Sequence, residues 1–192
     1  MKRPDGGGKL KALPLPPHLL RTMLILSATN GKNLDLAHAF AAEATNNGVA
    51  AEVISLPELQ IPLYDSLGNS SAGDGLLKLA QAMRQHKSLV ICAPEYNGSI
   101  PPVLSNAIAW LSVSTDDFRA LFNSRPVALA THSGGGGQKV MLAIRQQLSH
   151  LGCTVLGREV QSNSQKAANP EAIAALVSQL AALESSYEGA TV

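Results

Sequence analysis

Hydrophobic positions along this chain follow two alternating patterns. Short, nearly uninterrupted apolar runs occupy residues 22–26, 49–55, 89–92 and 126–131, and a fifth begins near Cys153. Runs of this length, bounded by turn residues, predict strands that are buried on both faces. Between them, apolar residues recur every three or four positions, which predicts amphipathic helices. The expected helices are 34–47, 75–86, one that begins at Pro102, one that carries Val140 to Leu151, and 170–183.

This alternation of strands and helices predicts a single α/β domain. Five strands separated by helices are expected to form a parallel sheet with right-handed crossovers and helices on both faces. Local signals agree with the helix limits, since Gly48 follows the first helix, Pro102 opens the third, and Asp74 is expected to cap the second. We expect the domain to span residues 22–185, followed by a short tail, 186–192.

The composition favours one globular core with some of its surface buried between subunits. The chain has 192 residues, of which 45% are hydrophobic, and this length is enough for one core rather than two. Only 15% of the residues are charged, below the usual level of about 25%, which favours a homodimer or homotetramer. The helix with Ala107, Ala109 and Trp110 is a candidate contact, and the alternative is that Trp110 fills the core of the monomer. Cys92 and Cys153 lie in predicted strands and predict core packing, with no disulfide framework or metal site.

The charge is distributed unevenly along the chain. Residues 1–21 carry five lysines and arginines and one aspartate, so this segment has a charge of +4 and the remainder −3. A mildly acidic body does not suggest a nucleic-acid partner, and no apolar run reaches the roughly 18 residues of a membrane span. The Gly/Pro-rich segment 1–21 is expected to be a disordered tail, or a weak electrostatic tether. It lacks the apolar core of a signal peptide, which predicts a cytoplasmic location.

Candidate chemistry is concentrated in three loops that each follow a strand, because the carboxyl ends of parallel strands share one edge of a sheet. The first loop contributes Ser27, Thr29, Asn30, Gly31, Lys32 and Asn33. Hydroxyl groups and a glycine directly before a helix favour phosphate binding by backbone N–H groups. Simple helix capping by Asn30 or Asn33 accounts for these residues equally well. The absence of G-x-G-x-x-G and G-x-x-x-x-G-K-[ST] argues against dinucleotide and triphosphate loops.

The second loop contributes Pro94, Glu95, Tyr96, Asn97 and Gly98. Proline fixes the backbone, and Gly98 allows the chain to come close to a flat ligand whose ring edge Tyr96 would cover. The alternative for this loop is a rigid turn with a surface tyrosine.

The third loop contributes Ser133, Gly134 and Gly135 from the string Thr131–Gly137. Glycines between a buried strand and an amphipathic helix favour close approach of a ligand to the backbone, and a flexible linker is the weaker interpretation. We interpret His132 as a hydrogen-bonded structural residue rather than an acid or base.

These strings carry a resemblance to a known family. The matching segments are IPLYD, ICAPEYNGSIPPVLSNAIAWLS, and RPVALATHSGGGG followed by VMLAIRQQLSHLG. With them the chain resembles the NAD(P)H-dependent FMN reductases, which include quinone, azo-dye and chromate reductases. The resemblance implies a flavodoxin-like three-layer α/β/α sandwich with a five-stranded parallel sheet in the order 2-1-3-4-5. It also implies FMN as cofactor, NADPH or NADH as co-substrate, and a small acceptor such as free flavin, a quinone, an azo compound or a metal ion.

The same resemblance assigns a role to each loop. The first loop would hold the FMN phosphate, Pro94 to Gly98 would pass along the isoalloxazine ring, and Ser133 to Gly135 would approach its other edge. It implies no catalytic side chain, because the cofactor performs the chemistry.

The chain departs from the family in the first loop, which usually reads G-S-x-R-x-x-S-x-N, because no arginine occurs between Arg21 and Arg84. A flavodoxin-like electron carrier without NAD(P)H turnover and a flavin-free interaction module therefore remain alternatives.

Overall fold

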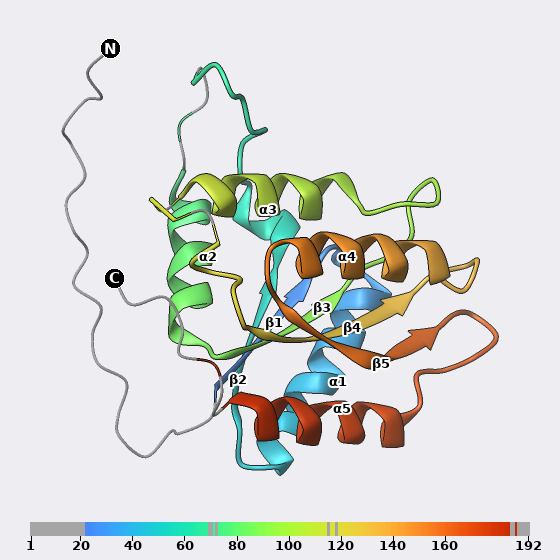
Figure 1. Cartoon of the computed structure of the whole chain (residues 1–192). Coiled ribbons are helices and arrows are strands. Elements are labelled where there is room, and N and C mark those ends of the chain that lie inside the picture. The colour runs from blue at the N-terminus through green and yellow to red at the C-terminus, as the bar shows by residue number, and fades with distance from the viewer. Residues whose placement is uncertain are drawn as a thin grey trace.

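A five-stranded parallel sheet forms the centre of the molecule. The computed structural model describes residues 22–68, 71, 73–114, 116–117, 119–184 and 187, so the predicted tail 1–21 lies outside the described residues. All neighbouring strands are parallel and follow the order β2-β1-β3-β4-β5, as the family resemblance implies (Figure 1). The strands are β1 (Thr22–Ser27), β2 (Ala50–Ser55), β3 (Ser88–Cys92), β4 (Pro126–His132) and β5 (Thr154–Ser162).

Helices cover both faces of this sheet and complete three layers. α2, α3 and α4 lie on one face, and α1 and α5 lie on the other (Figure 1). Their bounds are α1 (Lys32–Asn46), α2 (Asp74–Gln85), α3 (Pro102–Val113), α4 (Gln138–His150) and α5 (Pro170–Leu183), with a short 3₁₀ helix η1 (Leu56–Leu59) after β2. The predicted flavodoxin-like sandwich is therefore confirmed. Among the helices in the described ranges, none is long and apolar enough to cross a membrane.

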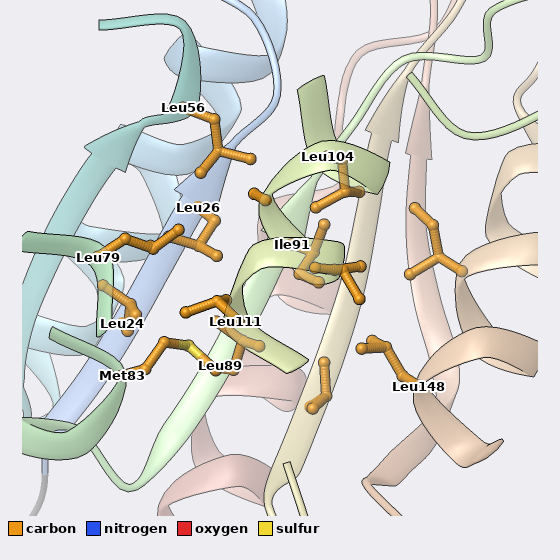
Figure 2. Close-up of a cluster of buried hydrophobic side chains, with 14 of the residues drawn as sticks. Leu24, Leu26, Leu56, Leu79, Met83, Leu89, Ile91, Leu104, Leu111 and Leu148 are labelled. Carbon is orange, nitrogen blue, oxygen red and sulfur yellow. The ribbon is translucent and has the colours of Figure 1, made fainter. Parts of the chain in front are cut away.

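Alternate residues of the strands supply two separate cores. Leu24, Leu26 and Ile91 point toward α2, α3 and α4, where they pack with Met83 and Leu104 (Figure 2). Their neighbours in the strands point to the opposite face and pack against α1 and α5. Because both faces are covered, the inner strands β1, β3 and β4 are buried almost throughout and read as continuous hydrophobic runs, whereas the edge strands β2 and β5 carry polar and partly exposed residues.

The α2 and α3 region contradicts one prediction and decides between two alternatives for Trp110. The prediction that Asp74 caps α2 is wrong, because Asp74 is the first helical residue and the cap is Gly73, with no side-chain hydrogen bond. Trp110 is buried and donates from Nε1 to the Pro62 carbonyl at 2.7 Å, with its ring edge-on to Tyr64 at 5.2 Å. Trp110 therefore fills the core of its own subunit.

A buried polar cluster closes the edge of the sheet where the strands begin. Arg125, directly before β4, is 0% exposed and donates to the carbonyls of Leu121, Met83 and His86. It also donates to the hydroxyl of Tyr187 at 2.6 Å and lies over that ring, 4.6 Å from its centroid. Packing of the domain therefore reaches Tyr187, two residues beyond the predicted limit at 185.

The same edge holds a buried carboxylate. Glu184 accepts from the Thr22 N–H at 3.1 Å and from the Ser88 hydroxyl at 2.6 Å. These bonds join the starts of β1 and β3 to the residue that follows α5. We call Thr22, Ser88, Arg125, Glu184 and Tyr187 the closed edge.

Candidate functional site

The three predicted loops meet at the opposite edge, where the strands end. They follow β1, β3 and β4, which are neighbours in the sheet, so the strand order itself brings them together. The Ala28 N–H donates to the Cys92 carbonyl at 2.9 Å, and the Ala93 N–H donates to the Ala130 carbonyl at 3.1 Å. The chain reverses its direction of winding between β1 and β3, and this is the position where doubly wound sheets bind ligands.

The first loop presents unused backbone donors at the start of α1. Gly31 is the cap residue, and no side chain hydrogen-bonds there, so neither Asn30 nor Asn33 caps the helix. Across the part of the chain that the structure describes, the N–H groups of residues 30–33 have no protein acceptor. Orphan N–H groups at the positive end of a helix dipole form a binding site for an anion.

Most side chains of this loop shape it rather than project from it. Ser27 is buried and donates from its hydroxyl to the Thr29 carbonyl at 2.7 Å. Asn30 accepts from the hydroxyl of Ser55, at the end of β2. The Thr29 hydroxyl has no protein partner in the described ranges and is half-buried, so it is a further donor available to a ligand.

Two other candidates of this loop are also engaged. The Asn33 side-chain amide donates to the His132 carbonyl at 3.0 Å and accepts from the His132 N–H at 2.8 Å, which fastens α1 to the end of β4. Lys32 pairs with Asp35 at 3.2 Å in a contact where both side chains are about 70% exposed. The cationic character of the loop therefore comes mainly from the helix N-terminus.

The second loop is a tight hairpin turn. Tyr96 and Ser99 exchange backbone hydrogen bonds of 3.1 and 2.9 Å, and both central residues have positive φ, +52° at Asn97 and +73° at Gly98. Positive φ at both positions defines a type I′ turn, for which Asn-Gly is the favoured dipeptide. The turn alone therefore accounts for Gly98. Tyr96, at the base of this turn, is 48% exposed and is free to cover a ligand.

Glu95 connects the second loop to the third. Its backbone N–H donates to the Ser133 hydroxyl at 2.7 Å, and Ser133 also contacts the Thr131 hydroxyl at 3.0 Å. Its carboxylate accepts from the N–H groups of Lys139 and Val140, at 3.1 and 3.4 Å. The side chains of Glu95 and Ser133 are thus hydrogen-bonded within the protein. Only their backbone is left to line the candidate site.

The third loop contains glycines of two kinds. At Gly137, φ is +73° and an added Cβ would lie 2.6 Å from Cγ2 of Thr131, so the fold itself requires glycine there. At Gly134 and Gly135, as at Gly31, φ is not positive and an added Cβ would meet nothing within 4 Å. Packing does not explain these three glycines, whereas a ligand lying against the backbone would.

Two observations bear on acid–base and metal chemistry. Nδ1 of His132 lies 3.2 Å from the Ser162 hydroxyl, so His132 is hydrogen-bonded as expected, and its structural role stays a prediction. No three His, Cys, Asp or Glu side chains gather within the described ranges.

The fold and the three loops define the class of flavodoxin-like proteins. The sequence model of the NADPH-dependent FMN reductases matches residues 22–167. The chain therefore belongs to this family, as the strings around the second and third loops predict.

Curated relatives and solved structures agree with this assignment. A quinone reductase of Escherichia coli K12 is 38% identical over 112 residues, which are 56% of this chain and 58% of that protein. This chain thus matches somewhat more than half the length of that relative. An uncharacterized MG342 homolog of Mycoplasma pneumoniae is 27% identical over 139 residues, covering 70% and 82% of the two chains.

Structural similarity extends over nearly the whole domain. FerB of Paracoccus denitrificans, described as a flavoenzyme NAD(P)H:(acceptor) oxidoreductase, has a TM-score of 0.71 at 17% identity, covering 88% of this chain and 99% of that chain. An archaeal flavodoxin has a TM-score of 0.61 at 11% identity, covering 85% and 99%. At these identities the likeness supports the fold.

The residues present fit FMN, the cofactor that the family implies. A phosphate needs several donors in one place, and the start of α1 offers unused N–H groups and the Thr29 hydroxyl. A flat ring needs backbone that carries no side chains, which Gly134 and Gly135 provide. Backbone N–H groups at a helix N-terminus are a general means of binding phosphate.

Proposed function

We propose that the protein is an NAD(P)H-dependent FMN reductase that passes electrons from NADPH or NADH to a small acceptor such as a quinone, an azo compound, free flavin or a metal ion. The observation that carries this proposal is the group of unused N–H donors at residues 30–33, beside a third loop in which Gly134 and Gly135 face open space. Family membership supports the same assignment. Bound FMN would supply the hydride and electron chemistry, so the protein needs no catalytic side chain.

The first loop would bind the phosphate. The backbone of Asn30, Gly31, Lys32 and Asn33 would donate hydrogen bonds, and the Thr29 hydroxyl would add another. Ser27, the Asn30 side chain and the Asn33 side chain would hold the loop in shape through the bonds that they make within the protein.

The second and third loops would bind the ring. Pro94 to Gly98 would form one wall, with Tyr96 over a ring edge, and Gly134 and Gly135 would approach the other. Backbone N–H groups of Asn97 and Gly98 have no protein acceptor among the described residues and would be free to donate to the ring.

Two measurements test this proposal together. FMN should bind at least about 100-fold more tightly than riboflavin, because loss of the phosphate forfeits several charge-assisted hydrogen bonds of about 1.5–3 kcal/mol each. Anaerobic NADPH or NADH should then bleach the absorbance of the bound flavin.

The outcomes separate the alternatives. Binding of FMN without bleaching would favour an electron carrier, and equal affinity for FMN and riboflavin would overturn the phosphate site. A protein that binds neither compound would favour a flavin-free interaction module.

We further propose a homodimer or homotetramer in the cytoplasm. Large apolar side chains on the outside of the subunit support the assembly: Leu63, Leu67, Val113 and Leu142 are 79%, 84%, 53% and 66% exposed. Light scattering at micromolar concentration tests it, and a monomeric mass would count against it. Cell fractionation tests the cytoplasmic location.

A further inference from the structure

We propose that Glu95 is a positioning residue that sets the separation of the two walls of the flavin site, and that its carboxylate does not contact the flavin. This inference rests on the proposed function, because it assigns a role within that site. It concerns how the second loop is held against the third.

The Glu95 carboxylate accepts hydrogen bonds from the N-terminus of a helix in another part of the chain. It accepts from the N–H groups of Lys139 and Val140, 44 and 45 positions away, at 3.1 and 3.4 Å. These groups belong to the first turn of α4, which the third loop precedes. Since the residue before α4, Gly137, makes no side-chain cap bond, Glu95 supplies from the second loop the acceptor that the helix lacks.

Two further contacts join the same pair of loops. The Glu95 N–H donates to the Ser133 hydroxyl at 2.7 Å, at the first residue of the third loop. The aliphatic chain of Lys139 lies along the turn, with its Cδ 3.4 Å from the position of a Cβ built on Gly98. Glu95 is thus bound on both sides of the third loop, by its backbone to Ser133 at the start of the loop and by its side chain to α4 after it.

These contacts have a consequence for binding. The ring would lie between the second loop and Gly134–Gly135, so the gap between these walls must match the dimensions of the ring. Without the carboxylate, the second loop keeps its own turn but loses its attachment to α4. A flavin would then have to order the two walls on binding, which lowers its affinity.

The experiment compares Glu95→Ala with Glu95→Gln, which keeps an acceptor oxygen. For Glu95→Ala we expect FMN affinity to fall about tenfold or more, and amide hydrogen exchange at Lys139 and Val140 to accelerate in the flavin-free protein. For Glu95→Gln we expect FMN affinity and flavin midpoint potential close to those of the wild type.

Asn169→Ala is the matched control, because Asn169 caps α5 by accepting from the Glu171 N–H at 2.9 Å and lies outside the three loops. It should lower the melting temperature of the flavin-free protein about as much as Glu95→Ala does, while leaving FMN affinity within about twofold.

Four results would overturn the inference. Wild-type affinity in Glu95→Ala, or a loss of affinity in Asn169→Ala as large as in Glu95→Ala, would remove the positioning role. If Glu95→Gln changed the midpoint potential as much as Glu95→Ala, the carboxylate would be acting on the flavin directly. Failure of the wild-type protein to bind FMN would overturn the proposed function as well, whereas the first three results would leave that function intact.

Discussion

The two edges of the sheet use polar groups in opposite ways. At the closed edge, the buried Arg125 side chain donates to three backbone carbonyls and to the Tyr187 hydroxyl. The Glu184 carboxylate accepts from Thr22 and Ser88. At the opposite edge, four successive N–H groups at residues 30–33 have no protein acceptor in the described part of the chain. We call this second region the open edge.

The two edges thus differ in role: polar groups at the closed edge stabilise the fold, and those at the open edge are available to bind a ligand. Buried polar groups are nearly always hydrogen-bonded, because an unpaired one is costly. The closed edge satisfies this rule within the chain, so it contributes stability and offers nothing to a ligand. The open edge leaves its donors where solvent or a ligand must satisfy them, so changes there should affect binding more than folding.

The largest effect is expected at the closed edge, from Arg125→Met. It would leave three buried carbonyls and the Tyr187 hydroxyl without their donor, at a cost of about 3–5 kcal/mol. For a protein of this size the melting temperature should fall by roughly 6–20 °C. Thermal unfolding of the flavin-free protein measures the change, and Arg84→Met, at an exposed arginine of α2, is the control. FMN affinity of the folded variant should be unchanged, and a fall below about 3 °C would contradict the role of Arg125.

Alkaline pH should destabilise the protein through one buried thiol near each edge. Burial raises the pKa of Cys153 from 9.0 to about 12, although nearby Arg125 lowers it, and burial also raises the pKa of Cys92 at the end of β3. Above pH 9 the unfolded chain loses thiol protons that the folded chain keeps. The free energy of unfolding should therefore fall by about 1.4 kcal/mol per pH unit for each thiol.

Denaturant unfolding between pH 8 and about 10.5 measures this slope. Cys92→Ala and Cys153→Ala should each flatten it by about 1.4 kcal/mol per pH unit. An unchanged slope in either variant would mean that its thiol ionises in the folded protein.

The third loop contains both kinds of position, one that stabilises the fold and one that would contact a ligand, within residues 134–137. Gly137→Ala should cost about 1–3 kcal/mol of stability, because φ is +73° and the new Cβ would clash with Thr131. Gly135→Ala should change stability by less than about 0.5 kcal/mol, because its Cβ meets nothing, but it should weaken FMN binding. Melting temperature and FMN titration of both variants measure these effects. Unaltered FMN affinity in Gly135→Ala would argue against a ligand at this glycine.

The smallest effect is expected from Lys32→Ala. Its pair with Asp35 is largely exposed and is worth about 0.2–0.5 kcal/mol. FMN affinity should fall by less than about fivefold, because the backbone N–H groups and not the ammonium would bind the phosphate. A loss of 100-fold in an FMN titration would instead make Lys32 the replacement for the missing arginine.

The sequence was sufficient to predict the strands and the meeting of the three loops at one edge of a parallel sheet. Both follow from continuous apolar runs and from the alternation with helices, which are local properties, whereas the strand order was implied only by the family resemblance. The Asn97–Gly98 turn could also have been predicted, since Asn-Gly is the strongest short-range hairpin signal. The roles of the site residues stay predictions.

The contacts of Glu95 and Arg125 could not be predicted, because they depend on partners distant in the chain. The Glu95 carboxylate binds N–H groups 44 and 45 positions away, and Arg125 binds a hydroxyl 62 positions away. A single arginine before a strand is normally exposed, so no local signal marks it as buried. Likewise, the sequence identifies Asn33 and Ser133 as polar loop residues. It cannot tell whether each side chain faces a ligand or a neighbouring loop of the protein.

The closed edge can form only late during synthesis of the chain, because its partners are far apart in the sequence. Thr22 and Glu184 are 162 positions apart, so the ribosome releases Thr22 long before Glu184. The three loops of the open edge are all synthesised by residue 140, well before Glu184 and Tyr187 emerge. A nascent chain therefore carries all three loops while the guanidinium of Arg125 still lacks Tyr187. The domain closes, at the edge opposite the three loops, only after residues 184 and 187 have emerged.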